Sequence, residues 1–457
     1  MNRLLALALL VLLALPAARS AAFGPNSGVV VARLTHADAG HGLARPDILH
    51  RSRSFRRRLL STTMTQPVRA RVRGGLGGGI VTNEYLVHVS VGTPPRPVAL
   101  TLDTGSDLVW TQCAPCRACF PQRLPLLDPA ASSSYAPLPC AAACRALPFA
   151  SCENRSSTCA YAYHYGDKSL TVGQLATDRF TFGPGDGKDN AARRLELTFG
   201  CGHFNKGVFQ ASETGIAGFG RGKLSLPSQL NVTTFSYCFA SMFHSSSSNS
   251  KTSSSFVTLG GAPIHSYAHV VGDWQTTPLL TNPSQPSLYF LSLKGISVGS
   301  TRVQIPEPRL RSTTTIIDSG ASITTLPEDV YEAVKAAFVA QVGLPLIINA
   351  GDDGASALAL DLCFALPVAA ALLPWRRPPR VPKLTMHLEG ADWEVPRAGY
   401  VFEDRAARVM CVVLDAAPGD QTVIGNFQQQ DTHVVYDLRN NLLSFAPARC
   451  DRLAAET

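Results

Sequence analysis

Two segments of this chain share one pattern. Asp103 lies in ALTLDTGSDLVW and Asp318 in TTIIDSGASITTL, so in both an apolar strand delivers Asp-(Thr/Ser)-Gly into a turn. Each copy precedes an apolar-apolar-Gly triplet, since Gly218 follows Asp103 by 115 residues and Gly425 follows Asp318 by 107. One such tripeptide carries little information, but two copies at similar spacing predict a duplicated lobe.

Short alternating segments bounded by turn residues predict strands through most of the chain after residue 80. Residues 327–341 carry the best helical pattern, with a proline at the start and acids in the first turn. The chain is 45% hydrophobic and 16% charged, a composition that excludes a disordered chain. Its 457 residues are enough for two lobes. We therefore predict a mainly β protein with two homologous lobes.

The N-terminus resembles a targeting segment. Residues 1–22 have one basic residue, an apolar run and small residues, the order of a secretory signal peptide. A transmembrane anchor would need a longer apolar run, and a plastid transit peptide would be richer in serine. Residues 23–79 are basic and end in a Gly-rich hinge, which predicts a poorly structured pro-segment; a leader without a role is the alternative. The C-terminal tail is polar, so we expect no membrane anchor.

The formal charge of +8 is concentrated in this leader. Residues 1–75 contain 12 arginines and two acids, whereas the rest has 29 basic and 31 acidic residues. If the leader is removed, the basis for binding an anionic partner is lost with it. We therefore expect no nucleic-acid binding by the mature form, although a protein that retained residues 33–73 could bind nucleic acid.

Twelve cysteines behind a secretory leader predict six disulfides. Seven lie within residues 113–159, which predicts a stapled insertion whose connectivity cannot be deduced by counting. A zinc or iron–sulfur site at 113–119 is disfavoured in an oxidising compartment, and we expect no metal and no cofactor. Neither H-E-x-x-H nor G-x-S-x-G occurs, so metalloprotease and common serine-hydrolase chemistry lack support. The sequons at Asn154 and Asn231 predict glycosylation of surface loops.

These motifs resemble the pepsin-like aspartic endopeptidases over roughly residues 80–452. The resemblance is carried by DTGSDLVW, DSGAS, the Tyr-Gly-Asp at 165–167 and both apolar-apolar-Gly triplets, and the Cys-rich insertion resembles the plant nepenthesin-type branch. It implies a bilobal acid-protease fold, with lobes at 80–272 and 273–457 and a cleft between them. It also implies a monomer that cleaves proteins and peptides, binds pepstatin-type inhibitors, and is secreted to the apoplast or sent to the vacuole.

The resemblance makes Asp103 and Asp318 the catalytic pair. Hydrolysis without a metal or covalent nucleophile needs a base to deprotonate water and an acid to protonate the carbonyl oxygen. Two carboxylates that share one proton supply both, and pepsin itself is the reference case for their coupled titration. An acidic optimum is expected to follow.

Neighbouring residues would support this pair. Gly105 and Gly320 allow the tight turns and the approach of substrate. By resemblance, Thr104 and Ser319 brace the two loops through backbone hydrogen bonds, and Ser106 bonds the outer oxygen of Asp103. The remaining carboxylates of interest are expected to be structural rather than catalytic: Asp107, Asp167, Asp178 and Asp437.

Tyr165 and Gly166 resemble the flap over the cleft, and Trp110 resembles the hydrogen-bond partner of the flap tyrosine. Both aromatic residues could instead be ordinary strand residues. Lys168 stands where this branch usually has glycine. Ala321 stands where the family often has a hydroxyl, so a threonine there should lower the pKa of the nearby carboxyl.

The resemblance also implies a disulfide pairing: Cys113–Cys116, Cys119–Cys201, Cys140–Cys159, Cys144–Cys152, Cys238–Cys450 and Cys363–Cys411. A non-catalytic protein on the same fold, such as a plant xylanase inhibitor, is the main alternative function. It predicts loss of a catalytic aspartate, whereas both are present. A DNA-binding relative of plastid type is a further alternative and requires a retained basic leader.

Overall fold

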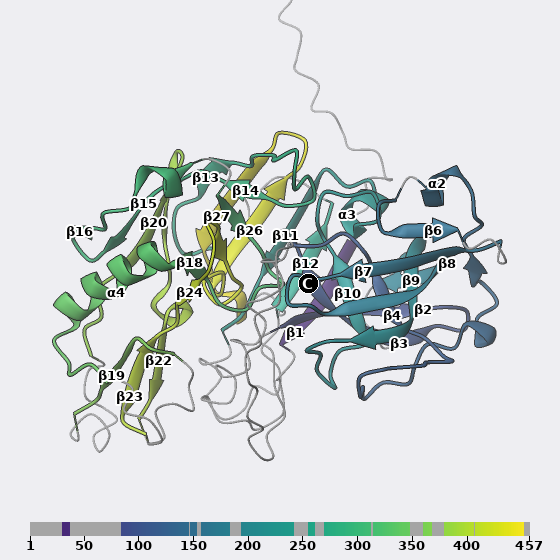
Figure 1. Cartoon of the computed structure of the whole chain (residues 1–457), viewed down its shortest axis with the longest axis horizontal. Helices are drawn as coiled ribbons and strands as arrows, with labels where there is room; N and C mark the ends of the chain where they lie inside the picture. Colours follow the sequence, from purple (N-terminus) through teal and green to yellow (C-terminus); the bar gives the residue numbers. More distant parts are fainter. Residues whose placement is uncertain are drawn as a thin grey trace, which may run out of the picture.

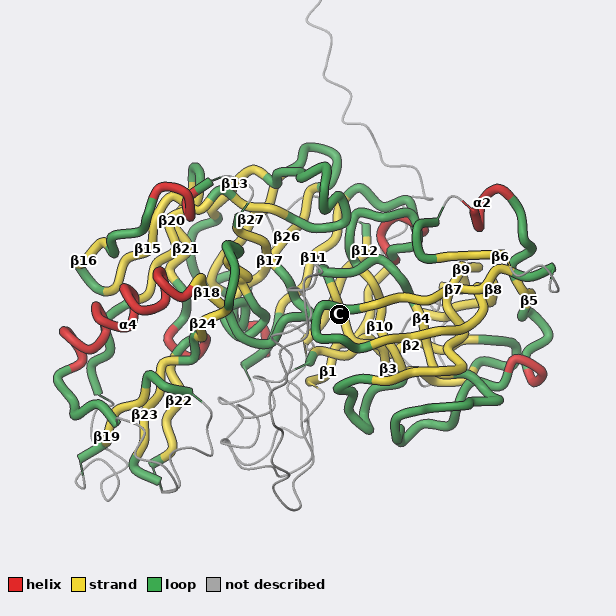
Figure 2. Tube along the Cα trace, in the orientation of Figure 1, coloured by secondary structure: helices red, strands yellow, loops and turns green. Residues whose placement is uncertain are grey.

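The computed structural model describes residues 30–36, 84–145, 147–152, 157–182, 193–241, 255–260, 269–311, 314–347, 360–367, 379–405 and 407–451. Strands dominate these residues, and helical segments are few (Figure 2). The predicted signal peptide, the 74–79 hinge and Asn154 lie outside them. No helix in these ranges is long and apolar enough to cross a membrane.

The largest sheet of the described chain belongs mostly to the N-terminal lobe, at the right in Figure 1, and continues into the middle of the molecule. Its strands run in the spatial order β13 (Gln275–Pro278), β27 (Leu442–Pro447), β26 (Thr432–Asp437), β11 (Thr234–Cys238), β12 (Ser255–Leu259), β1 (Val30–His36), β2 (Tyr85–Val91), β3 (Arg96–Asp103), β10 (Gly215–Gly218), β4 (Trp110–Gln112), β9 (Arg193–Lys206), β8 (Leu170–Phe182), β7 (Cys159–His164) and β6 (Ala150–Cys152), with β5 (Ala136–Pro137) beside β8.

Three smaller sheets build the C-terminal lobe, at the left in Figure 1. One contains β14 (Phe290–Leu291), β17 (Thr315–Ile317), β25 (Thr422–Ile424), β18 (Thr325–Pro327) and β24 (Asp415–Ala417). The second contains β16 (Thr301–Arg302), β15 (Leu293–Val298), β20 (Leu384–Leu388) and β21 (Ala391–Glu394), and the third β19 (Cys363–Ala365), β23 (Val409–Val412) and β22 (Val401–Asp404). The helices are α2 (Ala142–Arg145), α3 (Leu226–Gln229) and α4 (Glu328–Val342), with 3-10 turns η2 (Pro129–Ala131), η4 (Glu307–Leu310) and η6 (Arg397–Gly399).

The two lobes repeat one arrangement of strands. In the first, β10 pairs in parallel with β3 and antiparallel with β4. In the second, β25 pairs in parallel with β17 and antiparallel with β18. The apolar-apolar-Gly triplets are therefore the strands beside those that end at the two aspartates, which explains why the sequence repeats both elements together.

The predicted helix is confirmed as α4, which packs on β15, β18 and β24. Val330, Val334 and Phe338 are buried on one face, and Gly343 ends the helix at φ 66°. Glycine adopts this left-handed conformation without the steric cost that other residues incur.

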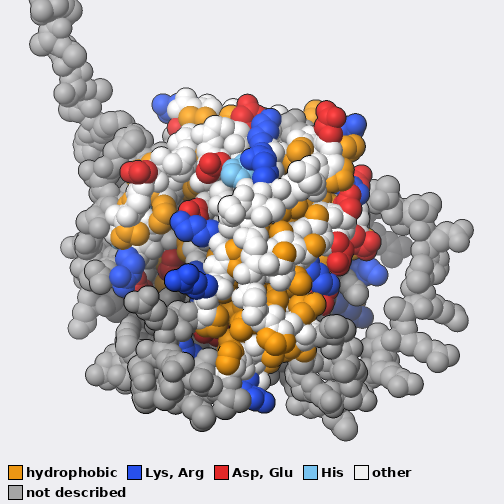
Figure 3. Space-filling model, turned by 90° about the vertical axis from the view of Figure 1, so that its left-hand side faces the viewer, with side chains coloured by type: hydrophobic (Ala, Val, Ile, Leu, Met, Phe, Trp, Pro, Cys, Tyr) orange, Lys and Arg blue, Asp and Glu red, His pale blue; other side chains and the backbone are white. Residues whose placement is uncertain are grey.

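On the C-terminal side of the molecule, basic and acidic side chains both reach the surface (Figure 3).

Strand β1 differs from the prediction. It lies inside the segment predicted to be a poorly structured pro-segment, yet it pairs antiparallel with both β12 and β2 in the centre of the molecule (Figure 1). Ala32 and Leu34 are buried on one face. Apolar and polar residues alternate here in the sequence, but the arginine-rich composition of residues 23–79 led to the prediction of a poorly structured segment.

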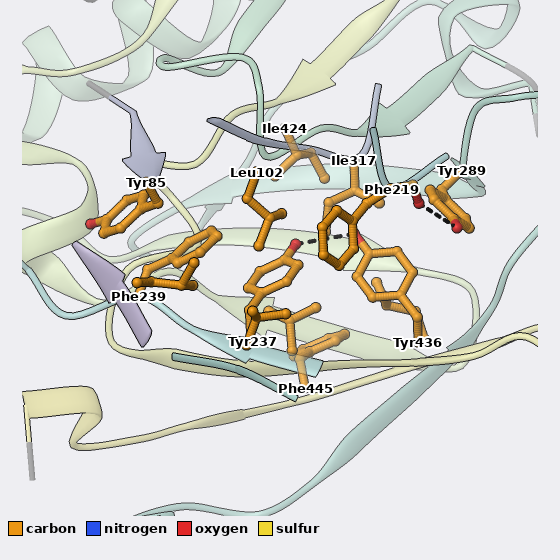
Figure 4. Packing of buried hydrophobic residues seen from close by; sticks show 14 of the residues in the cluster. Tyr85, Leu102, Phe219, Tyr237, Phe239, Tyr289, Ile317, Ile424, Tyr436 and Phe445 are labelled. Atoms are coloured by element: carbon orange, nitrogen blue, oxygen red, sulfur yellow. Dashed lines mark hydrogen bonds between the residues drawn. The ribbon is translucent and has the colours of Figure 1, made fainter. Parts of the chain in front are cut away.

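Aromatic side chains form the core beneath the two Asp-(Thr/Ser)-Gly turns. Tyr237 and Tyr436 contact each other through their hydroxyls, which lie 3.1 Å apart (Figure 4). Tyr85 and Phe239 stack nearby with ring centroids 4.1 Å apart. Because these residues come from strands of both halves of the chain, the core that holds the lobes together is continuous.

Four of the six disulfide predictions are wrong, while Cys238–Cys450 and Cys363–Cys411 are present as predicted. The wrong pairs are Cys113–Cys116, Cys119–Cys201, Cys140–Cys159 and Cys144–Cys152. The structure instead contains Cys113–Cys201, Cys116–Cys119, Cys140–Cys152 and Cys144–Cys159.

Strand register explains why Cys113 pairs with Cys201 rather than with Cys116. The parallel pairing of β4 with β9 places Thr111 opposite Cys201, and the backbone N–H of Cys113 donates to Gly202. Cys113 therefore lies next to Cys201, with 5.4 Å between their Cα atoms.

The other two wrong pairs involve four cysteines whose sulfurs lie close together. Strands β6 and β7 place Cys152 opposite Cys159, and the sulfur of Cys144 lies 3.9 Å from that of Cys152. Side-chain direction among neighbouring sulfurs, which spacing in the sequence does not reveal, decides the partners.

Candidate active site

The two Asp-(Thr/Ser)-Gly turns face each other between the lobes. Asp103 ends β3 and Asp318 directly follows β17, and each side chain is 2% exposed. A Cβ atom built on Gly105 would lie 2.6 Å from the Asp318 carboxylate, and one on Gly320 would lie 2.2 Å from that of Asp103. Each turn therefore has room for the other turn's carboxylate only because glycine has no side chain.

A reciprocal pair of hydrogen bonds joins the turns. The backbone N–H of Thr104 donates to Oγ of Ser319 at 3.0 Å, and the backbone N–H of Ser319 donates to Oγ1 of Thr104 at 2.9 Å. The Ser319 hydroxyl also donates to the carbonyl of Leu102 at 2.9 Å. The family resemblance implied this bracing, and both hydroxyl residues are fully buried.

Each aspartate accepts hydrogen bonds from its own turn. The N–H of Gly105 donates to Oδ1 of Asp103 at 2.9 Å, and the Ser106 hydroxyl donates to its Oδ2 at 2.5 Å, as predicted. The N–H of Gly320 donates to Oδ1 of Asp318 at 2.8 Å. These hydrogen bonds fix the orientation of each carboxylate within its own turn.

The glycines of the two apolar-apolar-Gly triplets allow the loops that follow Asp103 and Asp318 to fold back. A Cβ on Gly218 would lie 2.3 Å from the backbone of Asp107, and one on Gly425 would lie 2.6 Å from the backbone of Ile323. A larger residue at either position would push the loop away from its neighbouring strand. This close approach gives a physical reason for the second part of the repeat.

Tyr165 lies where a flap residue is expected, at the turn after β7. The indole N–H of Trp110 donates to the Tyr165 hydroxyl at 2.7 Å, the contact that the resemblance implied. The flap turn is closed by the N–H of Lys168, which donates to the carbonyl of Tyr165 at 3.0 Å. Lys168 has a φ of 71°, which accounts for the usual preference for glycine there.

One pocket brings the predicted residues together. It is lined by Asp103, Gly105, Ser106, Tyr163, His164, Tyr165, Gly166 and Asp318. Thr104, Ser319 and Trp110 lie behind this lining and hold it in position. Of the other predicted sites, Asn231 is exposed in a turn with a φ of 51°, outside the pocket.

Sequence reasoning missed several residues around the site. Tyr163 lines the pocket, and burial raises the pKa of its hydroxyl. The Asn426 and Gln429 side-chain amides donate to the carbonyls of Ser319 and Asp318 at 3.0 and 3.2 Å. The run of amides in GNFQQQ was the available signal, but a polar run usually indicates an exposed loop, whereas these amides are fully buried.

The carboxylates expected to be structural have structural partners. Asp167 accepts hydrogen bonds from the N–H and hydroxyl of Ser169 in the flap turn. Asp178 accepts from the hydroxyls of Ser132 and Ser134, and Asp437 closes the turn after β26. Within the described ranges, no group of three or more His, Cys, Asp or Glu residues is placed to hold a metal ion.

Comparison with known proteins finds relatives in plants. Residues 85–261 match the family model for the N-terminal part of xylanase inhibitors, and residues 288–447 match the corresponding C-terminal model. Aspartic proteinase nepenthesin-1 of Nepenthes gracilis is 36% identical over 91% of this chain and 89% of its own length. Aspartyl protease family protein 2 of Arabidopsis thaliana is 36% identical over 92% of this chain and 85% of its own length.

Solved structures agree on the fold. Basic 7S globulin from soybean superposes with a TM-score of 0.61 at 17% identity, covering 92% of this chain and 97% of that one. Conglutin gamma from lupine seeds gives 0.59 at 19% identity, covering 80% and 91%. The predicted mainly β, two-lobed architecture is thereby confirmed.

Proposed function

The chain belongs to the pepsin-like family of aspartic proteases, in its nepenthesin-like plant branch, and we propose that it is an endopeptidase active at acidic pH. Asp103 and Asp318 would activate one water molecule between them. Proteins and peptides would be the substrates, as the names of the related proteases imply. We further propose a secreted or vacuolar monomer that is inhibited by pepstatin-type compounds.

The opposed geometry of the two turns carries this proposal. Both carboxylates line one pocket, each against the other turn's glycine, and the buried Thr104–Ser319 brace limits their movement. Two close carboxylates resist double ionisation and retain one proton between them over an acidic range. The ionised member can take a proton from water while the protonated member donates to the carbonyl oxygen of the substrate.

The flap would cover the substrate during this step. Tyr165 lines the pocket and is held by the hydrogen bond from Trp110. A flap that closes over the bound peptide would exclude bulk water and strengthen the electrostatic interactions at the carboxylates. Gly166, in the flap turn, would let the peptide backbone approach closely.

Maturation is part of the proposal. We propose that residues 1–22 are a signal peptide, that 23–79 are a pro-segment, and that the lobes comprise 80–272 and 273–457. Complete removal of 23–79 would take β1 from its place between β12 and β2. N-terminal sequencing of the purified protein, with mass spectrometry for a retained 30–36 peptide, would establish what remains.

The test is cleavage of denatured globin at pH 3–5 by the wild type, with and without pepstatin, and by Asp103→Asn. We expect pepstatin-sensitive cleavage by the wild type and none by the variant, because an amide cannot serve as the base. Asp178→Asn is the matched control, since this buried aspartate of the same lobe is bonded to Ser132 and Ser134 away from the pocket. Full pepstatin-insensitive activity in Asp103→Asn would refute the mechanism.

A non-catalytic inhibitor is the second candidate, because the matched family models are described as those of xylanase inhibitors. It predicts no globin cleavage by the wild type and inhibition of a microbial xylanase. The same preparation can be tested in both assays. The intact pair of aspartates and glycines favours the protease.

A further inference from the structure

Asp107 lies in the N-terminal catalytic loop, four residues after Asp103, and is 8% exposed. A buried carboxylate this close to the active pair is costly unless its oxygens have hydrogen-bond donors. Its contacts lead to three separate elements that must all hold their places for the active site to form.

Each polar group of Asp107 has a different partner. Oδ1 accepts the backbone N–H of Gly222 at 2.7 Å, and Oδ2 accepts the hydroxyl of Ser287. The backbone N–H of Asp107 donates to the hydroxyl of Tyr163 at 3.2 Å. Gly222 follows β10 in the N-terminal lobe, Ser287 precedes β14 in the C-terminal lobe, and Tyr163 belongs to the flap strand β7.

The surroundings enclose the carboxylate tightly. A Cβ on Gly220 or on Gly222 would lie 2.4 or 2.2 Å from its oxygens. The two partner segments also bond to each other, since the N–H of Arg221 donates to the carbonyl of Ser287 at 3.0 Å. The Tyr289 hydroxyl donates to the carbonyl of Phe219 at 2.8 Å, as Figure 4 shows.

We propose that Asp107 is a positioning residue of the reaction, which joins the N-terminal catalytic loop to the opposite lobe and to the flap strand. This inference rests on the proposed protease function. The contact with Ser287 crosses between the lobes, so it limits their relative movement at the loop that carries Asp103. The contact with Tyr163 places the flap strand relative to that same loop.

The surroundings of Asp107 shift the pKa of its carboxyl in opposing directions. Burial raises the pKa of the Asp107 carboxyl, the hydrogen bonds from Ser287 and Gly222 oppose this rise, and the charge of Asp103 adds to it. Tyr163 and Tyr289 are the other titratable groups that interact electrostatically with it, and the Arg221 guanidinium lies over the Tyr289 ring.

The ionised form of Asp107 affects the catalytic pair. Wherever Asp107 is ionised, its negative charge disfavours the second ionisation of the catalytic pair, because like charges repel. The upper limb of the pH–rate profile therefore stands at higher pH than it would without this charge.

The test compares Asp107→Ala, Asp107→Asn and Ser287→Ala with Asp178→Ala as the matched control. Asp178 is a buried aspartate of the same lobe whose Oδ1 accepts hydrogen bonds from the hydroxyls of Ser132 and Ser134. Asparagine retains the shape of Asp107. Its carbonyl accepts from Gly222, and its NH₂ group donates to the oxygen of Ser287, so it mimics the protonated acid.

We expect Asp107→Ala to lower kcat roughly 10- to 100-fold with little change in KM, because displacing a catalytic group by about 1 Å can have that effect. Asp107→Asn should restore most of kcat and move only the upper limb to lower pH. Ser287→Ala should lower kcat by a smaller factor. Asp178→Ala should lower the denaturation midpoint without altering kcat of the folded enzyme or its pH profile.

The inference is overturned if the wild type is active while Asp107→Asn leaves the upper limb in place or moves it upward. It is also overturned if Ser287→Ala retains full kcat. If Asp107→Ala does not fold, the other two variants still decide the matter. A wild type without pepstatin-sensitive cleavage refutes the proposed function and, with it, this inference. An active wild type whose variants behave otherwise than expected overturns this inference alone.

Discussion

Replacing Thr104 with valine removes the bracing hydroxyl between the catalytic turns and keeps the shape of the side chain. In the structure this hydroxyl accepts the backbone N–H of Ser319 at 2.9 Å and lies 3.5 Å from the carbonyl of Ile317. Both Thr104 and Ser319 are fully buried, so no water replaces the lost oxygen. The variant therefore leaves a buried N–H without a partner.

The cost follows from this geometry. A buried donor without a partner costs about 1–3 kcal/mol, and loss of the long hydrogen bond to Ile317 adds at most about 1 kcal/mol. We expect the free energy of unfolding to fall by about 2–3 kcal/mol. The turn that carries Asp318 should also become less restrained, and kcat should fall by roughly 10-fold or more because the two carboxylates lose their fixed separation.

The assay combines urea denaturation with initial rates of peptide cleavage at acidic pH, expressed per folded enzyme. Thr111→Val is the matched control, since Thr111 is a buried threonine of the same lobe whose hydroxyl donates to the carbonyl of Thr214 at 3.0 Å. It should cost about 1 kcal/mol and leave kcat unchanged. Equal effects of the two valines on kcat would refute the bracing role.

Three further changes test other contacts. Trp110→Phe removes the 2.7 Å hydrogen bond to Tyr165, and kcat/KM should fall about five-fold, for a loss of about 1 kcal/mol; an unchanged steady-state rate would contradict the flap contact. Ala321→Thr adds a hydroxyl at a position that is 4% exposed and should move the acidic limb of the pH–rate profile to lower pH, whereas Ala321→Val should not; a limb that stays or rises argues against it. Burial, together with the charge of His269, lowers the pKa of His433 from 6.5 to about 3, so the folded protein loses stability as pH falls from 6.5. His433→Asn should flatten the fall in the denaturation midpoint between pH 6.5 and 4, and an unchanged slope would show that another group is responsible.

Much of the fold could be predicted because it is written in local patterns. The alternation of apolar residues indicated the strands, and the spacing in 327–341 indicated α4. The repeated turns identified Asp103 and Asp318, since a tripeptide that recurs after an apolar strand is visible without any knowledge of distant contacts. The same patterns indicated a role for Gly105 and Gly320, because a close approach between two loops leaves no room for a side chain.

Features that depend on register were decided only by the tertiary structure. Cys113 pairs with Cys201 because β4 lies parallel to β9, and no spacing between cysteines reveals that neighbour. Strand β1 is stable because β12 and β2 flank it, although its own segment is rich in arginine. Both cases require contacts between residues far apart in the chain.

Asp107 illustrates the same division. The sequence places it four residues after Asp103 and indicates a structural role for it. Its partner Gly222 lies 115 residues further along the chain, in the same lobe, and its partner Ser287 lies 180 residues further along, in the opposite lobe, so both meet it only in the folded structure. Local pattern therefore identified the residues that we propose to carry the chemistry. Long-range packing determined what holds them in place, because hydrogen bonds and burial depend on distance in space rather than on distance along the chain.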